Sequence, residues 1–409
     1  MSKVQNSASS SLGEHRSMER YDLPPWPYFS NDEIRQVVDV LRSGKVNYWT
    51  GNEVQEFEKE FASACGTKFA TALANGTVAL EAALHGLGIG KGDEVVITPR
   101  TFVASAGSIV NCGAVPVFAD VDPLSGNISP DEISAVITPR TKAIIAVHLA
   151  GWPCDMDEIN ALAAAHNLKV IEDCAQAHGA TYKGRPVGSL GHVGTYSFCQ
   201  DKIMTTGGEG GMLVTSDYEL WQKVWSHKDH GKDYFATHGE GAGPGFRWVH
   251  EQFGTNWRMT EMQGAIGRLQ LRKLPKWIER RRRNANLLTE CFRGFPALKV
   301  LEPPPHIGHA YYKYYVLVQP ERLAPGWDRD RLMATIKMNG VPCFSGSCSE
   351  VYLEASFRKS GLQPTRRLQV ARDLGERSLM FLVHPTLDDV DMRHVCRVVS
   401  GVIEEASLR

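Results

Sequence analysis

From about residue 70 onward, short apolar runs alternate with stretches of helical period, and this alternation constrains the fold more than any other feature. The expected strands are Glu94–Thr98, Val115–Ala119, Ala143–Val147, Val170–Glu172, Val193–Phe198 and Met212–Val214. The expected helices between them are Val78–Leu87, Phe102–Cys112, Ser129–Val136 and Asp155–Asn167. Several of these strands are continuously apolar, as is typical of strands that are covered on both faces. The pattern therefore predicts a mostly parallel sheet covered by helices.

The pattern changes after Asn256. Thr260–Ile278 reads as a long amphipathic helix, followed by a charged run through Arg283. Beyond it come a strand-like segment at Tyr311–Val318 and helical segments at Arg329–Met338 and Val390–Glu404. A chain of 409 residues with 43% hydrophobic content can bury one large core and a second, smaller one. We expect a polar, flexible tail at residues 1–22, a large domain at 23–265 and a small α+β domain at 266–409.

Charge and cysteine content narrow the class of protein. Lys and Arg total 45 against 46 Asp and Glu, so bulk charge attracts neither nucleic acid nor an anionic membrane. No apolar run approaches the roughly 20 residues that cross a bilayer, and the first 20 residues lack the apolar core of a secretory signal. The nine cysteines form no CxxC pair, and no His or Cys spacing is typical of a metal site. We expect a cytoplasmic protein with reduced thiols and no metal.

A first candidate site is the turn Asn75–Gly76–Thr77–Val78, which runs straight into an Ala- and Leu-rich helical segment. Backbone N–H groups and the dipole at a helix start favour a phosphate, and Gly76 permits a close approach. Taken alone, the same turn also fits an ordinary helix cap.

A second candidate follows the apolar Val170–Ile171. Asp173 lies at the carboxyl end of that expected strand, where open α/β sheets bind ligands. A carboxylate there can pair with a protonated pyridine nitrogen, and Gln176 can reach a ring hydroxyl. A helix cap is the alternative reading of both residues.

The third candidate is Lys202, which lies shortly after Ser197 at a strand end and just before a glycine-rich stretch. A desolvated lysine can attack an aldehyde as the neutral amine. A single lysine is more often a solvated surface charge, so the hypothesis depends on the order and spacing of the three signals together.

In that order the segment from Tyr48 to Leu269 resembles the sugar aminotransferases of the DegT/DnrJ/EryC1/StrS family, pyridoxal phosphate enzymes of fold type I. The matching motifs are Gly51 with Glu56–Glu58, Asn75–Leu80, Gly92–Val95, Thr101–Ala104, Asp120–Asp122, Glu172–Gly179, Ser197–Phe198 with Lys202, Thr205–Gly211, His230–Gly231 and Asn256–Glu261.

The resemblance implies a seven-stranded, mostly parallel sheet in an αβα sandwich and a role for each motif residue. Lys202 would form the Schiff base with pyridoxal 5'-phosphate, Asp173 would pair with the pyridine nitrogen, and Gln176 would contact the ring hydroxyl. Phe102 would stack on the ring, while Gly76, Thr77, Val78 and Ser197 would hold the phosphate. Asn256 resembles the residue that reaches the phosphate from the neighbouring subunit, which implies a homodimer.

Some positions depart from the family pattern. Cys199–Gln200–Asp201 replaces the usual residues before the lysine, and Asp201 either lies close to Lys202 or points away. Arg100 replaces a small or apolar residue, and it either meets a substrate anion or is a plain surface arginine. Cys343–Glu350 stands where relatives often have a substrate loop.

The implied reaction moves an amino group from an amino acid, expected to be L-glutamate, through pyridoxamine 5'-phosphate to a nucleotide-linked keto-sugar. The glycine-rich stretch looks more like that of relatives acting at C4 of a 4-keto-6-deoxyhexose. The product would serve surface-glycan, such as lipopolysaccharide, or antibiotic sugar synthesis. One alternative is a sugar dehydratase of the same fold, although such relatives carry histidine in place of the lysine. Another is a non-catalytic pyridoxal-binding regulator, in which the run Arg280–Arg283 binds nucleic acid rather than forming the solvated end of a helix.

Overall fold

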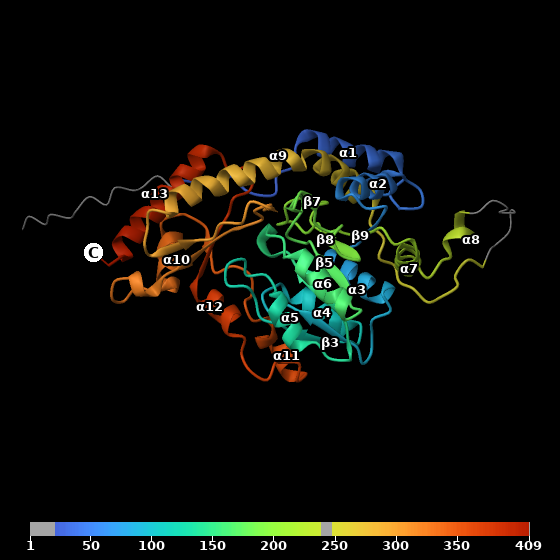
Figure 1. Ribbon diagram of the computed structural model, residues 1–409. Coiled ribbons are helices and arrows are strands. Elements are labelled where there is room, and N and C mark those ends of the chain that lie inside the picture. Colours follow the sequence, from blue (N-terminus) through green and yellow to red (C-terminus); the bar gives the residue numbers. More distant parts are fainter. Residues whose placement is uncertain (1–20, 239–247, 409) are drawn as a thin grey trace, which may run out of the picture.

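A seven-stranded sheet forms the centre of the larger part of the molecule in the computed structural model, which describes residues 21–238 and 248–408 (Figure 1). Its strands, in spatial order, are β1 (Phe69–Leu73), β9 (Gly211–Thr215), β8 (Val193–Ser197), β5 (Lys169–Asp173), β4 (Thr141–Val147), β2 (Glu94–Ile97) and β3 (Val115–Phe118). Only β9 runs against its neighbours, and the remaining pairings are parallel. The predicted mostly parallel sheet is confirmed. The sequence did not reveal β1, because its Phe-Ala-Thr-Ala-Leu run has weak strand propensity.

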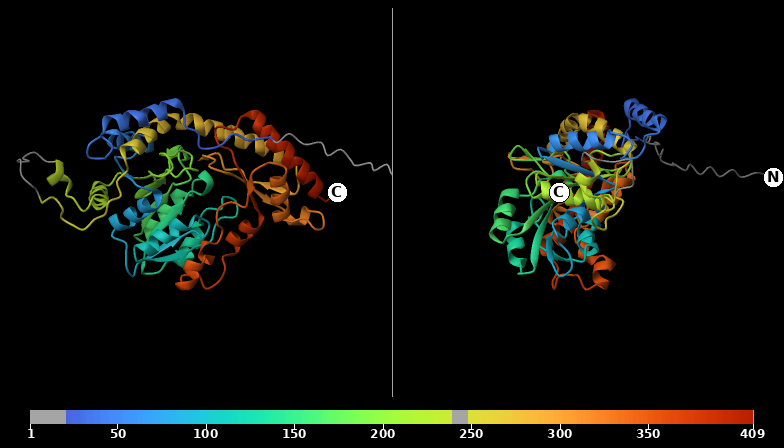
Figure 2. Two further views of the ribbon diagram at one scale, coloured as in Figure 1. Left: turned by 180° about the vertical axis from the view of Figure 1, so that it is seen from behind. Right: turned by 90° about the vertical axis from the view of Figure 1, so that its right-hand side faces the viewer.

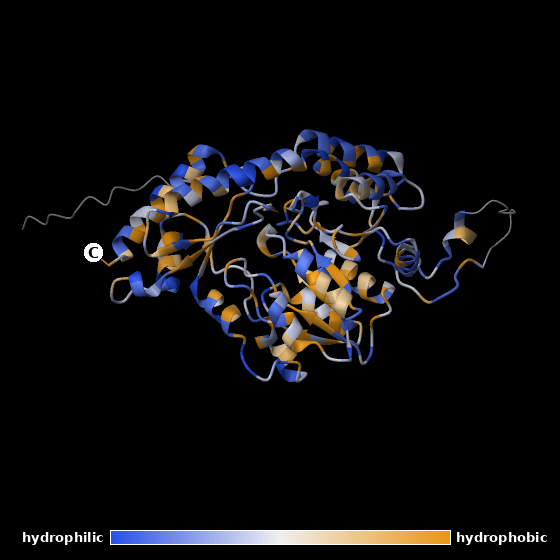
Figure 3. Ribbon diagram, viewed as in Figure 1, coloured by the Kyte–Doolittle hydropathy of each residue, from blue (hydrophilic) through white to orange (hydrophobic). Residues whose placement is uncertain are grey.

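Helices cover both faces of this sheet. On one face lie α3 (Gly76–Gly86), α4 (Val103–Asn111) and α7 (Tyr218–Lys228), and on the other α2 (Glu53–Cys65), α5 (Pro130–Val136) and α6 (Met156–Ala165). Neighbouring strand residues serve opposite cores: Val95 packs into one and Val96 into the other. Hydrophobic residues concentrate in the sheet and the helices on it, and hydrophilic ones along α1 (Asn31–Ser43) (Figure 3). The αβα sandwich of fold type I is thus present.

The smaller part is built on an antiparallel sheet with the order β10 (Leu298–Val300), β12 (Tyr314–Val318), β14 (Ser378–Phe381) and β13 (Cys343–Phe344). The helices α10 (Arg329–Met338) and α13 (Asp389–Ala406) pack on it. The predicted strand near Tyr311–Val318 and both predicted helices are confirmed to within a few residues.

One long helix, α9 (Glu261–Phe292), belongs to both parts (Figure 1). It begins at the capping residue Thr260, packs on α1 and α2, and then reaches α13. Its residue Ile278 lies in a core of the large sheet, whereas Leu288 lies in the core of the small sheet. The helix also runs along one side of the molecule when seen from behind, in the left view of Figure 2. The domain division at 265/266 stays a prediction, and so does the tail at 1–22, of which residues 1–20 lie outside the described residues.

The run Arg280–Arg283 does not form a solvated helix end, so that prediction is wrong. The run lies within α9, where the helix packs against the small sheet and its connections. Arg281 is buried and donates to the carbonyl of Tyr312 at 3.2 Å, and Arg282 donates to the carbonyl of His309 at 2.9 Å. Arg280 and Arg283 pair with Asp389. These cations are engaged by the chain itself, which weakens the alternative of a nucleic-acid site.

The chain after β13 returns to the large sheet. The turn η3 (Val351–Leu353) and α11 (Ala355–Lys359) pack into the core beside α4, and the N–H of Val351 donates to the carbonyl of Pro99 at 2.9 Å. The helix α12 (Gln369–Arg377) begins against Asp120, whose carboxylate accepts the N–H groups of Val370 and Ala371. A three-stranded sheet, β11 (Ile307–Gly308), β6 (Thr181–Tyr182) and β7 (Arg185–Pro186), adds a second link. The two sheets are therefore linked at two places.

Within the described ranges, none of the helices combines the length and the apolar character that crossing a bilayer requires. The short helix α8 (Tyr234–His238) lies on an arm that extends from the large sheet beyond α7 (Figure 1).

Candidate active site

A cavity of about 820 Å³ lies between the ends of the large sheet's strands and the small sheet. All predicted cofactor residues except Asn256 line it: Gly76, Thr77, Val78, Phe102, Asp173, Gln176, Ser197 and Lys202. These residues come from widely separated segments, so the fold alone brings them together. Asn256 is exposed, is joined by backbone pairing to Asp229 and is not among the residues that line this cavity.

Asp173 ends β5 inside the cavity and is buried, with only 4% of its surface exposed. Its carboxylate accepts the hydroxyl of Ser105 at 2.8 Å and the N–H of Ala175 at 3.1 Å. Burial raises the pKa of Asp173, and the hydrogen bond from Ser105 opposes the rise only in part. Both hydrogen-bond donors are neutral. A buried carboxylate with neutral donors fits a cationic ligand group, such as a protonated pyridine nitrogen.

The start of α3 and the end of β8 form a polar cradle. The side chain of Asn75 caps α3 by accepting the N–H of Val78 at 3.0 Å, while the N–H groups of Gly76 and Thr77 have no acceptor within the helix. A Cβ atom at Gly76 would lie 2.6 Å from the Cβ of Ser197. Glycine is thus required for Ser197 to lie against the helix start. N–H groups, the hydroxyls of Thr77 and Ser197 and the helix dipole together fit a phosphate.

Lys202 lies in the connection between β8 and β9, and 17% of its side chain is exposed. Its Nζ is 3.4 Å from Oδ1 of Asp201 and 5.3 Å from the ring centre of Tyr312. Its carbonyl accepts the indole N–H of Trp26 at 2.8 Å. The open question about Asp201 is therefore settled, because its carboxylate contacts the lysine.

Tyr312, which precedes β12 of the small sheet, also contacts Asp201. Its hydroxyl donates to the other carboxylate oxygen, Oδ2. Burial alone would raise the pKa of Asp201, but the charge of Lys202 and the hydrogen bond from Tyr312 hold it below its ordinary value. The carboxylate is therefore ionised at neutral pH and is available as the partner of the lysine amine.

Gln176 contributes a polar side chain to the cavity wall, and Phe102 contributes an apolar one. The side-chain oxygen of Gln176 accepts the N–H of Ala150 at 2.8 Å, which directs the amide toward ligands chiefly as a donor. Phe102 precedes α4 and leaves 66% of its surface exposed at the cavity. A flat apolar ring bound against Phe102 would cover that surface, as expected for a stacked pyridine.

Arg100 is not a surface arginine, and that alternative is wrong. It is 3% exposed, donates to the hydroxyl of Ser378 at 2.7 Å and lies over the ring of Tyr315. It lines a small separate cavity rather than the large one. The hydroxyl of Tyr315 in turn accepts the N–H of Ser347 at 2.8 Å. Arg100 thereby supports the Cys343–Glu350 loop, of which Phe344, Gly346, Ser347 and Cys348 line the large cavity.

Sequence reasoning missed Tyr312 and Lys313, which line the cavity from just before β12. Their run of tyrosines was interpreted as a strand only. A lysine within an otherwise apolar and aromatic segment was the available signal.

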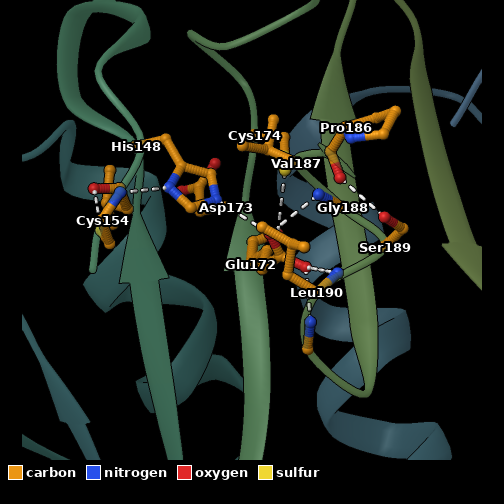
Figure 4. A network of polar contacts seen from close by, with 12 residues as sticks. His148, Cys154, Glu172, Asp173, Cys174, Pro186, Val187, Gly188, Ser189 and Leu190 are labelled. Atoms are coloured by element: carbon orange, nitrogen blue, oxygen red, sulfur yellow. Dashed lines mark hydrogen bonds and ion pairs between the residues drawn. The ribbon is translucent and has the colours of Figure 1, made fainter. Parts of the chain in front are cut away.

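A polar network behind Asp173 holds the site in place (Figure 4). The buried carboxylate of Glu172 accepts the N–H groups of Gly188, Leu190 and Gly191 and the Nε2–H of His148 at 3.0 Å. The Nδ1 of His148 accepts the N–H of Cys154. Although His148, Glu172 and Cys174 lie close enough to share an ion, the oxygens of Glu172 are already saturated with donors. The network anchors the turn at residues 186–191 under β5.

Comparisons with known proteins agree with this geometry. The model of the DegT/DnrJ/EryC1/StrS aminotransferase family matches residues 27–400. The X-ray structure of the aminotransferase from Psychrobacter cryohalolentis is 55% identical, with a TM-score of 0.92 over 94% of this chain and 99% of that chain. The GDP-perosamine synthase of Escherichia coli O157:H7 is 34% identical over 91% of this chain and 96% of its own. DesI, solved in the presence of its TDP-sugar product, is 29% identical, with a TM-score of 0.80 over 91% and 90% of the two chains.

Proposed function

The chain belongs to the DegT/DnrJ/EryC1/StrS aminotransferase family, and we propose that it transfers an amino group from L-glutamate to a nucleotide-linked keto-sugar. It is a pyridoxal phosphate-dependent sugar aminotransferase. One observation carries the proposal: Asp173, Lys202 and the cradle at Gly76 converge on a single cavity that is large enough for a cofactor and a substrate.

The residues present fit pyridoxal 5'-phosphate at both of its ends. Asp173 would hold the proton on the ring nitrogen, Gln176 would donate to the ring hydroxyl, and Phe102 would cover one ring face. Gly76, Thr77, Val78 and Ser197 would hold the phosphate, although the N–H of Val78 is donated to Asn75. The bound cofactor supplies an aldehyde that takes up the amino group and a ring that withdraws electrons from the reacting carbon.

Lys202 would perform the proton transfers. Its Nζ removes a proton from the α-carbon of the amino acid in the first half-reaction and returns one to the sugar carbon in the second. Asp201 and Tyr312 orient the amine in both stages, because Tyr312 holds the carboxylate that lies 3.4 Å from Nζ.

We infer that the sugar carbon aminated is C4 of a 4-keto-6-deoxyhexose, from the likeness of the Thr205–Gly211 stretch to relatives that act there. The relatives named for a GDP-sugar and a TDP-sugar support a nucleotide-linked substrate. The product would be an amino-sugar nucleotide for surface-glycan or antibiotic sugar synthesis. Since every cysteine is a free thiol, we expect the reaction to take place in the cytoplasm.

We further propose a homodimer with shared active sites. Asn256 does not line the cavity of its own chain, and the same segment carries large exposed rings, with Phe253 100% and Trp248 88% exposed. Such rings on an extended arm suit a protein interface. Asn256 would then contact the phosphate in the partner's cavity.

Spectroscopy of the purified protein tests the function. The protein loaded with pyridoxal phosphate should absorb visible light, lose that absorbance on addition of L-glutamate, and regain it with one class of nucleotide 4-keto-sugar. If the spectrum changes with no amino acid, the transaminase proposal is wrong and the alternative of a non-catalytic pyridoxal-binding regulator remains. Loss of a sugar hydroxyl without gain of nitrogen would instead reveal the dehydratase.

A further inference from the structure

Two cations line the large cavity among the residues that the structure describes, and the proposed mechanism uses one of them. Lys202 would form the bond to the cofactor, so its charge would not be available to hold a substrate. The other is Lys313, just before β12. The lining carboxylates are Asp173, Asp201 and Glu209. The proposed reactants all carry negative charge. Lys313 is therefore the remaining lining cation that can bind one of them.

The position of Lys313 places its amine near the reacting centre. Its Nζ lies 4.6 Å from the ring centre of Tyr312, and the Nζ of Lys202 lies 5.3 Å from the same centre. The hydroxyl of that ring is fixed on Asp201. Both amines therefore lie near the ring of Tyr312.

Lys313 is partly buried and has no carboxylate within ion-pair distance in the described part of the chain. Burial, together with the nearby charges of Arg281 and Lys202, lowers the pKa of Lys313 to about 8. The side chain is still mostly protonated at neutral pH. A buried ammonium without an ion-pair partner costs stability, and an anionic ligand would remove that cost.

We propose that Lys313 binds an anionic group of the substrate and thereby sets which substrate the cavity accepts. This inference rests on the proposed function. Two groups share the required chemistry, namely a carboxylate of the amino acid and a phosphate of the nucleotide sugar. The amine would hold either one through a charge-assisted hydrogen bond while the reacting carbon faces Lys202.

A purely structural role is the competing explanation. Lys313 also lies in the field of Asp201, so it could merely balance that carboxylate once Lys202 is bound to the cofactor. In that case its removal would slow both half-reactions alike and would not change the binding of anions. The two explanations therefore predict different effects of a Lys313 substitution on the affinity for anions.

The experiment compares the variants Lys313→Met and Lys313→Arg with the wild-type holoenzyme. Lys337→Met is the matched control, because Lys337 is exposed and lies over the ring of Phe344 but does not itself line the cavity. Calorimetry measures the dissociation constants of succinate and of UDP, GDP and dTDP. Stopped-flow absorbance measures each half-reaction separately.

Lys313→Met should weaken one probe class by about ten- to a hundredfold, the size of one lost charge-assisted hydrogen bond. Lys313→Arg should restore most of that loss, and Lys337→Met should change nothing. Weakened succinate binding with a raised KM for glutamate identifies the carboxylate, and weakened nucleotide binding identifies the phosphate. The proposal is overturned if a folded Lys313→Met protein binds every probe as the wild type does, or if the wild type binds none. Absence of transamination with retained Lys313-dependent binding would refute the proposed function instead.

Discussion

The carboxylate of Asp201 lies 3.4 Å from the amine of Lys202, its immediate neighbour in the chain, and is held there from the small sheet by the hydroxyl of Tyr312. This contact ties Lys202, in the connection between two strands of the large sheet, to the other wall of the cavity. Asp201→Asn should therefore retain the visible absorbance of the bound cofactor but slow both half-reactions by about tenfold, because the orienting charge is lost. Single-turnover absorbance measures both rates. Tyr312→Phe is the control that keeps the charge, and its effect should be smaller.

Lys202→Ala should abolish the visible absorbance of the loaded protein and slow transamination by at least about 10³-fold, since the covalent anchor and the proton carrier are the same group. The far-ultraviolet circular dichroism should be unchanged. A variant that retained either half-reaction at the wild-type rate would contradict the assignment.

Asp173→Asn should change the melting temperature in opposite directions in the cofactor-free protein and in the protein with bound cofactor. Because burial raises the folded-state pKa of Asp173, the stability it contributes is present when the carboxyl is protonated and is lost as pH rises from its ordinary pKa through the raised one. At neutral pH the cofactor-free variant should therefore melt at or above the wild-type temperature. With pyridoxal phosphate the order should reverse, because the ring nitrogen loses its partner. Thermal melts at several pH values measure both.

Gly76→Ala should weaken cofactor binding by at least about tenfold, since its Cβ would meet Ser197 at 2.6 Å and push the helix start away from the phosphate. Gly107→Ala is a matched control within α4, where a Cβ meets nothing within 4 Å. That substitution should instead stabilise the protein by about 0.5–1 kcal/mol. Equilibrium titration of pyridoxal phosphate and thermal melts distinguish the two.

Asn256→Ala and Lys202→Ala, each inactive or nearly so alone, should recover activity when mixed and allowed to exchange subunits. A mixed dimer would contain one site with both native residues and one with neither. Activity assayed before and after exchange measures the recovery. If mixing restores nothing although dimers form, Asn256 acts within its own chain or not at all.

Much of the fold follows from local patterns. The apolar runs that became β2, β4 and β5 are buried on both faces, so their composition alone marks them as strands. The alanine-rich β1 lacks such an apolar composition. It forms a strand because it pairs with β9, not because its own residues favour one. The prediction of a solvated helix end at Arg280–Arg283 was wrong for the same reason, because contacts with distant elements override the local pattern. Charge predicts exposure until another element, here the segments around Tyr312 and Asp389, supplies partners.

The sequence by itself determined which residues are proposed to hold the cofactor. Gly76 begins α3, Asp173 and Ser197 end β5 and β8, and Lys202 follows in the connection after β8. Parallel strands bring such ends to one edge of a sheet. Only the tertiary structure brought the opposite wall of the cavity, where we propose that the substrate binds, to these residues. Lys313, Tyr312 and the Cys343–Glu350 loop come from a second sheet, and the burial of Arg100 beneath that loop depends on how the two sheets pack. Periodicity reports which face of an element is buried, whereas the contact between two separately folded layers is set by side chains that are distant in the chain.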